Sequence, residues 1–337
     1  MTTLVTGGTG FIGLAIAERS LQAGEQIVLF DLPMVSGETC ALASQPGCRI
    51  VNGDIRSDAD LERAFAAGTI DRVIHAAAMT PGPESERDDA ARIFDVNVVA
   101  TARLLQRCAR SPNLKRVVVV SSVSVYGFTA PAASGCYEES ASTPAPAGLY
   151  GISKLAAEQA ALRIGELHGL DVRVARLGPV FGPWERASGA REHLSPHRQV
   201  TCAAIAGDEI VLPRPMTADW LYARDAADAL VRLAGAPALA HAVYHIGGGC
   251  LTDLPQWCAA LAHHFPGLRW RFSEPGEPAT VDYVLPMDRP ALSIARLMTE
   301  LNYVSRFDLK AAANDYLAWL SSDSSPVNQL EGKDATS

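Results

Sequence analysis

A tyrosine and a lysine four residues apart are the side chains of this sequence best suited to moving a proton. Tyr150 and Lys154 stand at the two ends of the run Tyr-Gly-Ile-Ser-Lys, and this spacing places both on one face of a helix. A phenol, with a pKa of about 10, is a poor base at neutral pH unless a cation stabilises its phenolate. Lys154 supplies that cation, and it is one of four lysines in a chain that otherwise uses arginine. The pair predicts general acid/base chemistry, although a solvated helix face would also carry these two residues.

Hydroxyl groups that can assist this chemistry follow a strongly apolar run. Ser121, Ser122 and Ser124 come directly after Lys115–Val120, a run typical of a strand that is buried on both faces. Ligands bind at the carboxyl ends of parallel strands. We therefore expect these serines to lie beside the reacting groups.

The beginning of the chain predicts a site for a dinucleotide. An apolar strand runs into Gly7, Gly10 and Gly13 and then into a helical stretch. The first glycine permits a tight turn, the second lets the backbone approach a pyrophosphate, and the third lets the helix pack on the sheet. The N–H groups at the start of that helix favour negative charge. The alternative is a glycine-rich turn that binds nothing.

An acidic residue then indicates which dinucleotide is bound. A second apolar run, Gln26–Phe30, ends in Asp31, at the distance where a carboxylate accepts hydrogen bonds from the adenosine ribose. A 2′-phosphate would be repelled there, and no Arg or Lys occurs between Asp31 and Cys48 to receive it. The sequence therefore predicts NAD rather than NADP.

Composition excludes several classes of protein. The chain has 337 residues, of which 48% are hydrophobic and 20% charged, and its net charge is −8. An acidic balance gives no reason to expect nucleic acid or an anionic membrane as a partner. No apolar run is long enough to span a bilayer and no leader precedes the first strand, so we expect a cytoplasmic protein. Seven cysteines without a C-x-x-C pair predict reduced thiols, with neither a metal site nor a disulfide framework.

Strands and helices alternate along most of the chain, which predicts an α/β fold with a doubly wound parallel sheet. The expected strands after the first two are Arg49–Asp54, Asp71–Ala76, Lys115–Val120, Val172–Leu177 and Ala242–Ile246. Helices are expected at Ala91–Arg110, Tyr150–His168, Ala223–Ala234, Leu254–His264, Ser293–Leu301 and Leu309–Leu320. The stretch Gly178–Pro215 is rich in proline and is expected to be mainly loop.

This pattern divides the chain into a nucleotide-binding part and a smaller lobe. We expect a Rossmann domain at 1–177, completed by about 220–248. Residues 178–219 and 249–320 should form a smaller C-terminal substrate-binding lobe, followed by a polar tail at 321–337.

Together these motifs resemble the NAD-dependent epimerase/dehydratase family of extended short-chain dehydrogenases/reductases, over Leu4 to about Leu320. The resemblance rests on the motifs Thr6–Gly13, Asp54-Ile55, His75–Ala78, Asn97-Val98, Ser121-Ser122 with Val125–Gly127, and Tyr150 with Lys154.

The resemblance implies a catalytic trio. Tyr150 would be the acid/base, Lys154 would bind the nicotinamide ribose and lower the pKa of the tyrosine, and Ser122 would hydrogen-bond the reacting oxygen, with Ser124 assisting. Asn97 would have a structural role near the active site, and His75 would be a packing residue at a strand end.

The resemblance also implies NAD as cofactor and a homodimer that pairs the helices at Ala91–Arg110 and Tyr150–His168 across a two-fold axis. The predicted cofactor contacts are Gly7, Gly10, Phe11, Ile12, Gly13, Asp31, Asp54, Ile55, Ala76, Ala77, Ala78, Asn97, Tyr150, Lys154, Pro179 and Val180. The predicted substrate contacts are Thr80, Ser122, Ser124, Arg186, Arg191 and Trp220.

The sequence departs from the sugar-nucleotide enzymes of this family at two places. Where those enzymes often carry an arginine that grips the substrate diphosphate, this chain has Ala218, and no acidic residue follows Ser122 as in the sugar dehydratases. Arg186, Arg191 and His193 offer instead a receptor for a small carboxylate or phosphate, unless the arginines only stabilise the lobe. The run around Trp220 loosely resembles the family's sugar-acid oxidising members, such as D-erythronate dehydrogenases.

Three functions stay open on the sequence alone. The preferred one is NAD-dependent hydride transfer at a hydroxyl-bearing carbon of a small sugar or sugar acid. The second is a nucleotide-sugar epimerase that forms a transient keto intermediate. The third is a non-catalytic NAD-sensing or scaffold protein, which predicts loss of Tyr150 or Lys154, yet both are present.

Overall fold

A sheet of seven parallel strands forms the centre of the molecule, as shown by a computed structural model that describes residues 1–33, 42–187, 193–283 and 287–322. The strands pair in the order β10-β6-β5-β4-β1-β2-β3. Their bounds are β1 (Thr2–Thr6), β2 (Gln26–Asp31), β3 (Cys48–Asn52), β4 (Arg72–His75), β5 (Arg116–Ser122), β6 (Val172–Leu177) and β10 (Val243–Ile246). The order reverses between β1 and β4, which makes a crevice at the carboxyl ends of these two strands. The predicted doubly wound α/β fold is confirmed.

The strand residues alternate between two cores, one on each face of the sheet. Val5 and Val118 pack into the core on one face, whereas their neighbours Leu4 and Val117 pack into the core on the other. All four side chains are fully buried. Continuous apolar runs are required for this double burial, which is why they were recognisable in the sequence.

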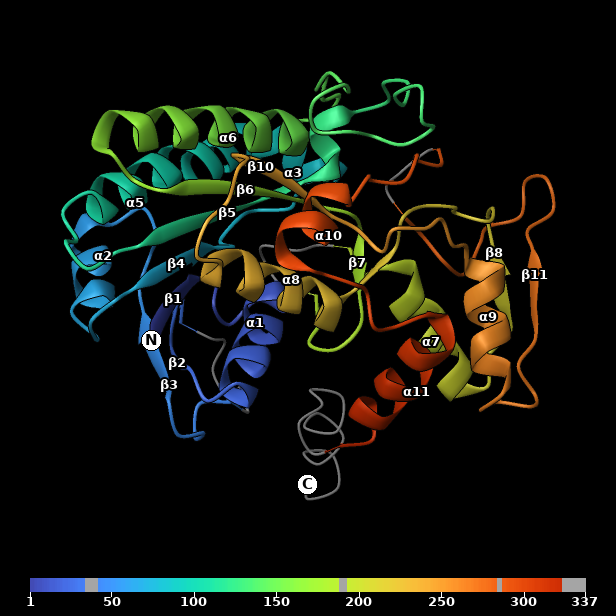
Figure 1. Cartoon of the computed structure of the whole chain (residues 1–337). Helices are drawn as coiled ribbons and strands as arrows, with labels where there is room; N and C mark the ends of the chain where they lie inside the picture. Colours follow the sequence, from blue (N-terminus) through green and yellow to red (C-terminus); the bar gives the residue numbers. More distant parts are fainter. Residues whose placement is uncertain (34–41, 188–192, 284–286, 323–337) are drawn as a thin grey trace.

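Helices cover both faces of the sheet (Figure 1). One layer holds α1 (Phe11–Gln22) and α8 (Ala223–Gly235), which pack against each other. The opposite layer holds α2 (Asp58–Phe65), α5 (Ala100–Cys108) and α6 (Leu149–His168). The helix α6 packs on β5 and β6 and carries Tyr150 and Lys154.

The helix predicted at Ala91–Arg110 is confirmed, and a π-helical turn that was not predicted lies within it. The structure has α4 (Ala90–Phe94), a π-helical turn at Asp95–Val99 and then α5. A short helix, α3 (Pro83–Asp88), precedes them. A π-turn leaves the backbone helical on both sides, so the sequence predicts the helix without revealing the turn within it.

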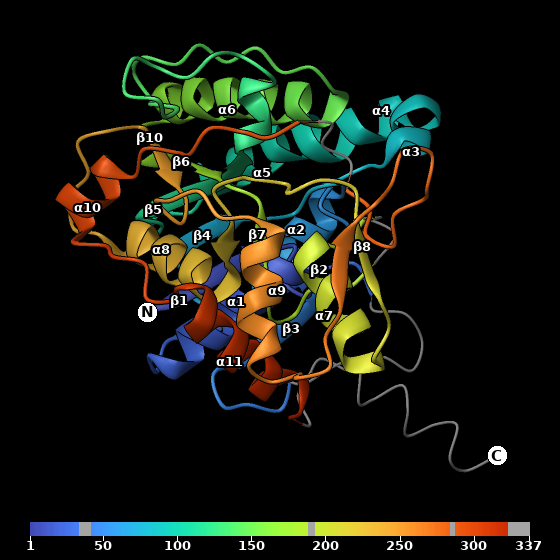
Figure 2. The same ribbon diagram turned by 90° about the vertical axis from the view of Figure 1, so that its right-hand side faces the viewer.

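Most of the remaining elements gather at one end of the molecule. Figure 2 looks onto this end, where α7 (Pro196–Ala206), α9 (Leu254–Ala262) and β8 lie together. Two pairs of short strands join here, β7 (Val180–Phe181) with β9 (Leu221–Tyr222), and β8 (Ile210–Leu212) with β11 (Trp270–Phe272). The helix α11 (Leu309–Leu320) packs on α9 at this end, whereas α10 (Ala295–Leu301) lies beside β10 and α8.

The helix α7 corrects the prediction of a loop over Gly178–Pro215. Ser195 caps this helix by accepting a hydrogen bond from the Arg198 N–H at 3.2 Å, and Pro196 occupies its first position. Proline is favoured there because the first helical N–H needs no partner within the helix. The proline that suggested a loop therefore starts a helix.

The division into a Rossmann domain and a lobe stays a prediction, because one core reaches across both parts. The core that contains Val5 of β1 also contains Trp257 of α9 and Tyr316 of α11. The predicted tail at 321–337 lies outside the described residues except for Ser321 and Ser322.

Candidate active site

A cavity of about 860 Å³ opens where the strand order reverses. Residues from the glycine turn, from the ends of β2, β4 and β5, from α6 and from the lobe line it. Its volume is in the range usual for sites that bind cofactors and small molecules. Nearly all of the predicted site residues are brought together here.

The glycine turn forms one wall of this cavity. Gly7 adopts a φ of +66°, and a Cβ on it would stand 2.7 Å from the backbone nitrogen of Ala77. A Cβ on Gly13 would stand 2.1 Å from the Gly7 carbonyl oxygen, so the start of α1 packs directly on the turn. A Cβ on Gly10 would meet only the Gly7 oxygen, at 3.2 Å. Gly10 therefore leaves space over the turn, as a pyrophosphate needs.

The helix α1 begins at this turn without a capping side chain. Gly10 is its N-cap, and no acidic residue occurs in its first turn. Phe11, Ile12 and Gly13 line the cavity. The unfilled N-terminus and the space over Gly10 fit a dinucleotide phosphate.

Asp31 lies at the end of β2 and lines the cavity as predicted. Its Oδ2 accepts hydrogen bonds from the backbone N–H of Thr9, at 3.0 Å, and from the Thr9 hydroxyl, at 2.9 Å. Thr9 also lines the cavity, although it was not among the predicted cofactor contacts. The threonine fixes the carboxylate beside the glycine turn, where a ribose would meet it.

Asp54 and Ile55 line the same end of the cavity, together with an arginine that was not predicted. Arg56 donates to both carboxylate oxygens of Asp54, with Nε at 3.0 Å from Oδ1 and Nη2 at 2.6 Å from Oδ2. These hydrogen bonds lower the pKa of Asp54 below its ordinary value. No Arg or Lys lies between Asp31 and Cys48 in the sequence. Because β3 pairs with β2, however, the residues after β3 return to the neighbourhood of Asp31.

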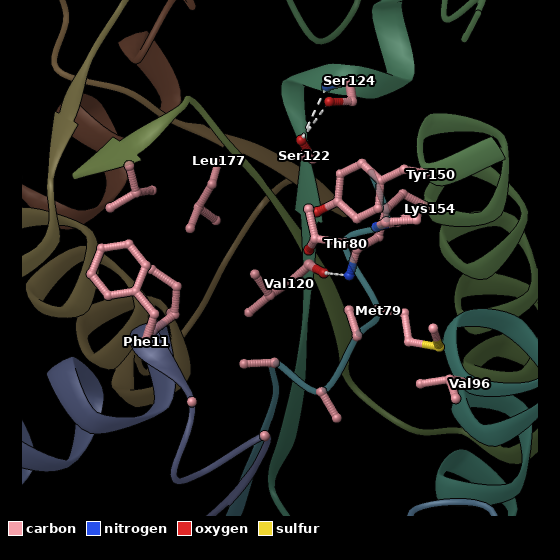
Figure 3. Close-up of a pocket in the computed structure, with 18 of the residues that line it drawn as sticks. Phe11, Met79, Thr80, Val96, Val120, Ser122, Ser124, Tyr150, Lys154 and Leu177 are labelled. Carbon is pink, nitrogen blue, oxygen red and sulfur yellow. Dashed lines mark hydrogen bonds between the residues drawn. The ribbon is translucent and has the colours of Figure 1, made fainter. Parts of the chain in front are cut away.

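The predicted acid/base pair projects from α6 toward the end of β5, as Figure 3 shows. Lys154 is 6% exposed, and its Nζ donates to the carbonyl oxygen of Val120 at 2.9 Å. The same nitrogen lies 5.9 Å from the centre of the Tyr150 ring. Burial lowers the pKa of Lys154 to about 8, against the opposing charge of Glu158. Lys154 therefore keeps its proton at neutral pH and can stabilise a phenolate.

Ser122 and Ser124 line the same cavity, from the end of β5 and the turn that follows it (Figure 3). The Ser122 hydroxyl donates to the Ser124 hydroxyl at 3.1 Å and accepts from the Ser124 N–H, also at 3.1 Å. Ser122 is thereby the N-cap of a 3₁₀ turn, η2 (Val123–Tyr126), which holds its side chain at the end of β5. The serine predicted to contact the reacting oxygen is fixed in the cavity.

The walls between these groups are made of small residues. Ala76, Ala77, Ala78 and Thr80 line the cavity after β4. Pro179 and Val180 line it from the segment after β6. These residues lie where they were expected.

Asn97 does not line the cavity, although it was predicted among the cofactor contacts. It is 2% exposed on the π-helical turn, and its side chain accepts from the Met79 N–H at 2.8 Å. Its amide also donates to the Met79 carbonyl oxygen and to the Ser153 hydroxyl, each at 3.0 Å. Through these hydrogen bonds Asn97 connects the loop after β4 to α6, at a position outside the cavity.

The predicted substrate contacts have three different outcomes. Thr80, Ser124 and Arg186 line the cavity, whereas Arg191 lies outside the described residues. The prediction for Trp220 is not supported, because this side chain is 6% exposed within the lobe and does not line the cavity. Its Nε1 donates to the Met216 carbonyl oxygen at 2.9 Å.

Arg289 is another arginine of the cavity that was not predicted from the sequence. Arg289 is 8% exposed and lines the cavity, with its Nη1 at 3.4 Å from the Ser124 hydroxyl. Its Nε is buried without a hydrogen-bond partner among the described residues. Burial lowers the pKa of Arg289 from its ordinary value, but a guanidinium stays charged at neutral pH.

The backbone around Arg289 is fixed from two sides. The Arg289 N–H donates to the Thr217 carbonyl oxygen at 3.3 Å. Leu292 donates its N–H to Asp219 at 3.0 Å, and Tyr137 donates to the Ala291 carbonyl oxygen at 2.8 Å. The segment has neither helical nor strand periodicity, so the sequence contained no signal that it returns to the site.

Among the described residues, no helix combines the length and apolar character needed to cross a membrane.

Comparison with known proteins places the chain in a family. The model of the NAD dependent epimerase/dehydratase family matches residues 3–247. The dTDP-glucose 4,6-dehydratase of Streptomyces niveus is 34% identical over 268 residues, which cover 75% of this chain and 75% of the relative. The UDP-glucose 4-epimerase of Mycolicibacterium smegmatis is 32% identical over 275 residues, which cover 78% and 82%.

A solved structure agrees with the fold. The UDP-glucuronic acid 4-epimerase of Bacillus cereus, in complex with NAD, has a TM-score of 0.75 at 21% identity and covers 96% of this chain and 100% of its own. The matching fold, the glycine turn and the tyrosine–lysine pair lead to one assignment. The chain belongs to the NAD-dependent epimerase/dehydratase family, as an enzyme of the extended short-chain dehydrogenase/reductase class with NAD as its cofactor.

Proposed function

We propose that this protein is an NAD-dependent dehydrogenase that oxidises a hydroxyl-bearing carbon of a small sugar acid. The observation that carries the proposal is Arg289, a buried cation in the cavity beside Ser124. A guanidinium binds a carboxylate through two parallel hydrogen bonds. The carboxylate of a sugar acid held there would leave its hydroxyl-bearing carbons near Ser122 and Tyr150.

Ala218 stands where sugar-nucleotide enzymes of the family often have an arginine that binds the substrate diphosphate, and its surroundings favour a smaller substrate. Ala218 is 4% exposed and pairs with Thr252 through two backbone hydrogen bonds of 3.1 and 3.0 Å. It does not line the cavity. An anionic substrate therefore finds its cations at Arg289 and Arg186 rather than at this position.

The proposed cofactor site uses residues that already line the cavity. Gly10 and the start of α1 would hold the pyrophosphate, and Asp31 the adenosine ribose. Asp54 and Ile55 would flank the adenine, and Lys154 would bind the nicotinamide ribose. NAD, when bound, supplies the hydride acceptor that the side chains of the protein lack.

Three side chains would then handle the proton. The Ser122 hydroxyl orients the substrate hydroxyl, and the Tyr150 phenolate takes its proton. Lys154 keeps the phenolate accessible near neutral pH, because its ammonium stabilises the negative charge. Asn97 holds α6 in place from behind, through Ser153.

The experiment is a screen with the purified protein and NAD, in which NADH absorbance is followed with sugar acids, neutral aldoses and nucleotide sugars. We expect turnover with a sugar acid, and Arg289→Leu should raise its KM at least tenfold while NAD affinity stays unchanged. Arg306→Leu is the matched control, because Arg306 is 54% exposed in its side chain and does not line the cavity. Turnover of neutral aldoses alone, or an unchanged KM in Arg289→Leu, would contradict the proposal.

A nucleotide-sugar epimerase is the second candidate, and it is favoured by the similarity to the UDP-glucose 4-epimerase of Mycolicibacterium smegmatis. An epimerase regenerates its cofactor in each cycle, so it produces no net NADH. Conversion of a UDP-sugar to its epimer without an absorbance change, together with thermal protection by UDP-sugars, would decide for it. The scaffold hypothesis is set aside, because the family is enzymatic and Tyr150 and Lys154 both line the cavity.

We also propose that the protein works as a cytoplasmic homodimer. Free thiols at the buried Cys108 and Cys258 are in keeping with a reducing compartment. Exposed apolar residues on the helices that the family pairs, such as Val99 and Ile152, are in keeping with a two-fold interface.

A further inference from the structure

A buried ion pair lies directly behind the catalytic lysine. Glu158 follows Lys154 by one helical turn on α6 and is 2% exposed. Arg176 on β6 is 6% exposed and donates Nε to both oxygens of Glu158, at 3.0 and 3.1 Å, and Nη2 to Oε2 at 2.7 Å. Because the guanidinium binds both oxygens of Glu158, it fixes the plane and position of this carboxylate.

The same carboxylate is joined to the catalytic strand. The hydroxyl of Ser121 donates to Oε1 of Glu158, and Ser121 lines the cavity next to Ser122. Glu158 therefore contacts the strand that carries the serines while it lies one turn from the lysine. Its position is set by three elements: α6, β5 and β6.

Stability alone gives little reason for such a pair. Two charges buried together recover little more than their desolvation cost, and apolar residues of the same size are often as stable. The neighbouring ammonium group of Lys154 gives a different reason for a buried carboxylate at this position. Lys154 is itself buried, which disfavours its charged form, and Glu158 is the described residue whose charge opposes that effect.

The other groups that face Lys154 do not replace this anion. His75 on β4 is buried and neutral, with a pKa lowered to about 3 by burial and by the charge of Lys154. Arg176 is a cation, and Tyr150 is the group that the lysine must serve. Without Glu158, the ammonium would face a cationic arginine and a positively charged nicotinamide ring.

We propose that Glu158 is a positioning residue for catalysis: held by Arg176 and Ser121, its carboxylate keeps Nζ of Lys154 protonated so that the lysine can stabilise the Tyr150 phenolate. This inference rests on the proposed function for the roles of Tyr150 and Lys154. The protonation state of Lys154 can nevertheless be measured without any substrate.

The same network provides a matched control. Arg176 donates Nη1 to the Tyr126 hydroxyl at 2.7 Å, and that hydroxyl lies 2.6 Å from Nε2 of His245. Glu139 accepts from the His245 N–H at 2.9 Å, and its side chain is 5% exposed. Glu139 is thus a second buried carboxylate at the far end of the network from Lys154.

The test is a pH titration of lysine side chains labelled with ¹³C at Cε and followed by NMR in the full chain. The sequence has four lysines, so the spectrum is simple, and Lys154→Met assigns the signal. We expect a wild-type midpoint near pH 8, a midpoint at least one unit lower in Glu158→Gln, and an unchanged midpoint in Glu139→Gln. A Glu158→Gln protein that folds and keeps the wild-type midpoint would overturn the proposal.

A double variant covers the case in which Glu158→Gln does not fold. Glu158→Gln combined with Arg176→Met removes both buried charges and leaves neither without a partner. The Lys154 midpoint should still fall, because the charge of Glu158, which raises the pKa of Lys154, is lost. An unchanged or raised midpoint in this variant contradicts the proposal.

Kinetics separate this inference from the proposed function. With any substrate that the screen identifies, the alkaline limb of kcat/KM should move to lower pH in Glu158→Gln and stay in place in Glu139→Gln. If no sugar acid is turned over, the proposed substrate is wrong, but the lysine titration still decides the role of Glu158. A carboxylate that acts only on stability would lower Tm in both variants and move neither titration.

Discussion

Gly151 on α6 and Ser124 on η2 approach so closely that no side chain fits between them: a Cβ on Gly151 would stand 2.5 Å from the Ser124 carbonyl oxygen. Gly151 follows Tyr150, and Ser124 follows the predicted catalytic serine by two residues. This contact therefore sets the distance between the acid/base helix and the serine turn. Gly→Ala at this position is a structural test of the site.

We predict that Gly151→Ala lowers kcat/KM at least a hundredfold, because α6 or η2 must move before the methyl group fits. Gly165→Ala is the control, since its Cβ would meet Cγ2 of Val172 at 2.6 Å, far along the same helix from Tyr150. It should lower Tm while kcat/KM stays within about threefold of wild type. Equal kinetic losses in the two variants would show that α6 acts only through overall stability.

Tyr150→Phe should lower turnover by about 10²–10⁴-fold, because no proton acceptor remains near the substrate oxygen. NAD affinity, measured by calorimetry, should hardly change. Tyr137→Phe is the control, because this buried tyrosine donates to the Thr129 carbonyl oxygen and does not line the cavity. A Tyr150→Phe enzyme that keeps more than about a tenth of wild-type turnover would remove Tyr150 from the chemistry.

The other two members of the trio should differ from Tyr150 in cofactor binding. Lys154→Met should lower turnover as strongly and also weaken NAD binding, since the ammonium is assigned to the ribose. Ser122→Ala should be milder, because Ser124 lies 3.1 Å from Ser122 in the same cavity.

The central sheet and most of the site were predictable because their signals are local. Buried parallel strands need continuous apolar runs, and a dinucleotide turn needs its glycines at fixed spacing. Tyr150, Lys154 and Ser122 each follow such a local signal, and all three line one cavity.

The parts that were missed depend on pairings between distant segments. Arg289 reaches Ser124 across 165 positions of sequence, from a segment with no periodicity. Arg56 comes near Asp31 only because β3 lies beside β2. The burial of Trp220 also depends on tertiary packing, since its ring lies 4.6 Å from that of His197.

The choice between NAD and NADP can be tested at Asp31 and Arg56, two charged residues that line the cavity. We expect NAD to bind at least tenfold more tightly than NADP, about 1.4 kcal/mol or more. Asp31→Ala should narrow that difference by relieving repulsion of a 2′-phosphate. Arg56→Ala should widen it, because this variant removes a cation from the cavity. Equal affinities of the wild type for NAD and NADP in calorimetry would contradict the assignment of Asp31.

The homodimer can be tested by light scattering, where the wild type should show about twice its chain mass of 35.8 kDa at micromolar concentration. Val99→Glu should produce monomers, because Val99 is 44% exposed just before α5, on the predicted interface. Leu251→Glu is the control, since Leu251 is 47% exposed in the lobe, outside that interface. A wild type that scatters as a monomer would refute the proposed assembly.

The last prediction concerns three buried histidines, His75, His197 and His245, whose pKa burial lowers to about 3. The unfolded chain takes up protons on these rings near pH 6.5, whereas the folded chain does so only near pH 3. Their contribution to stability is therefore complete above about pH 6.5 and is lost as the pH falls toward 3. Each ring adds a slope of about 1.4 kcal/mol per pH unit within that window.

His197 is the ring whose replacement separates this effect from hydrogen bonding. It is fully buried and stacks on Phe181 at 4.0 Å, and neither ring nitrogen has a hydrogen-bond partner among the described residues. His197→Phe removes two unsatisfied polar atoms, so the free energy of unfolding at pH 7.5 should stay within about 1 kcal/mol of wild type or rise. Between pH 6 and pH 4.5 the free energy of unfolding of His197→Phe should decrease less steeply than that of the wild type, by about 1.4 kcal/mol per pH unit.

Urea unfolding at several pH values measures both quantities. His245→Phe is the control, because it breaks the 2.6 Å contact with the Tyr126 hydroxyl and should cost about 1–3 kcal/mol at pH 7.5. A His197→Phe protein with the wild-type pH slope would show that this ring already takes up its proton in the folded state. A loss of more than about 2 kcal/mol at pH 7.5 would instead show that a polar partner satisfies the ring.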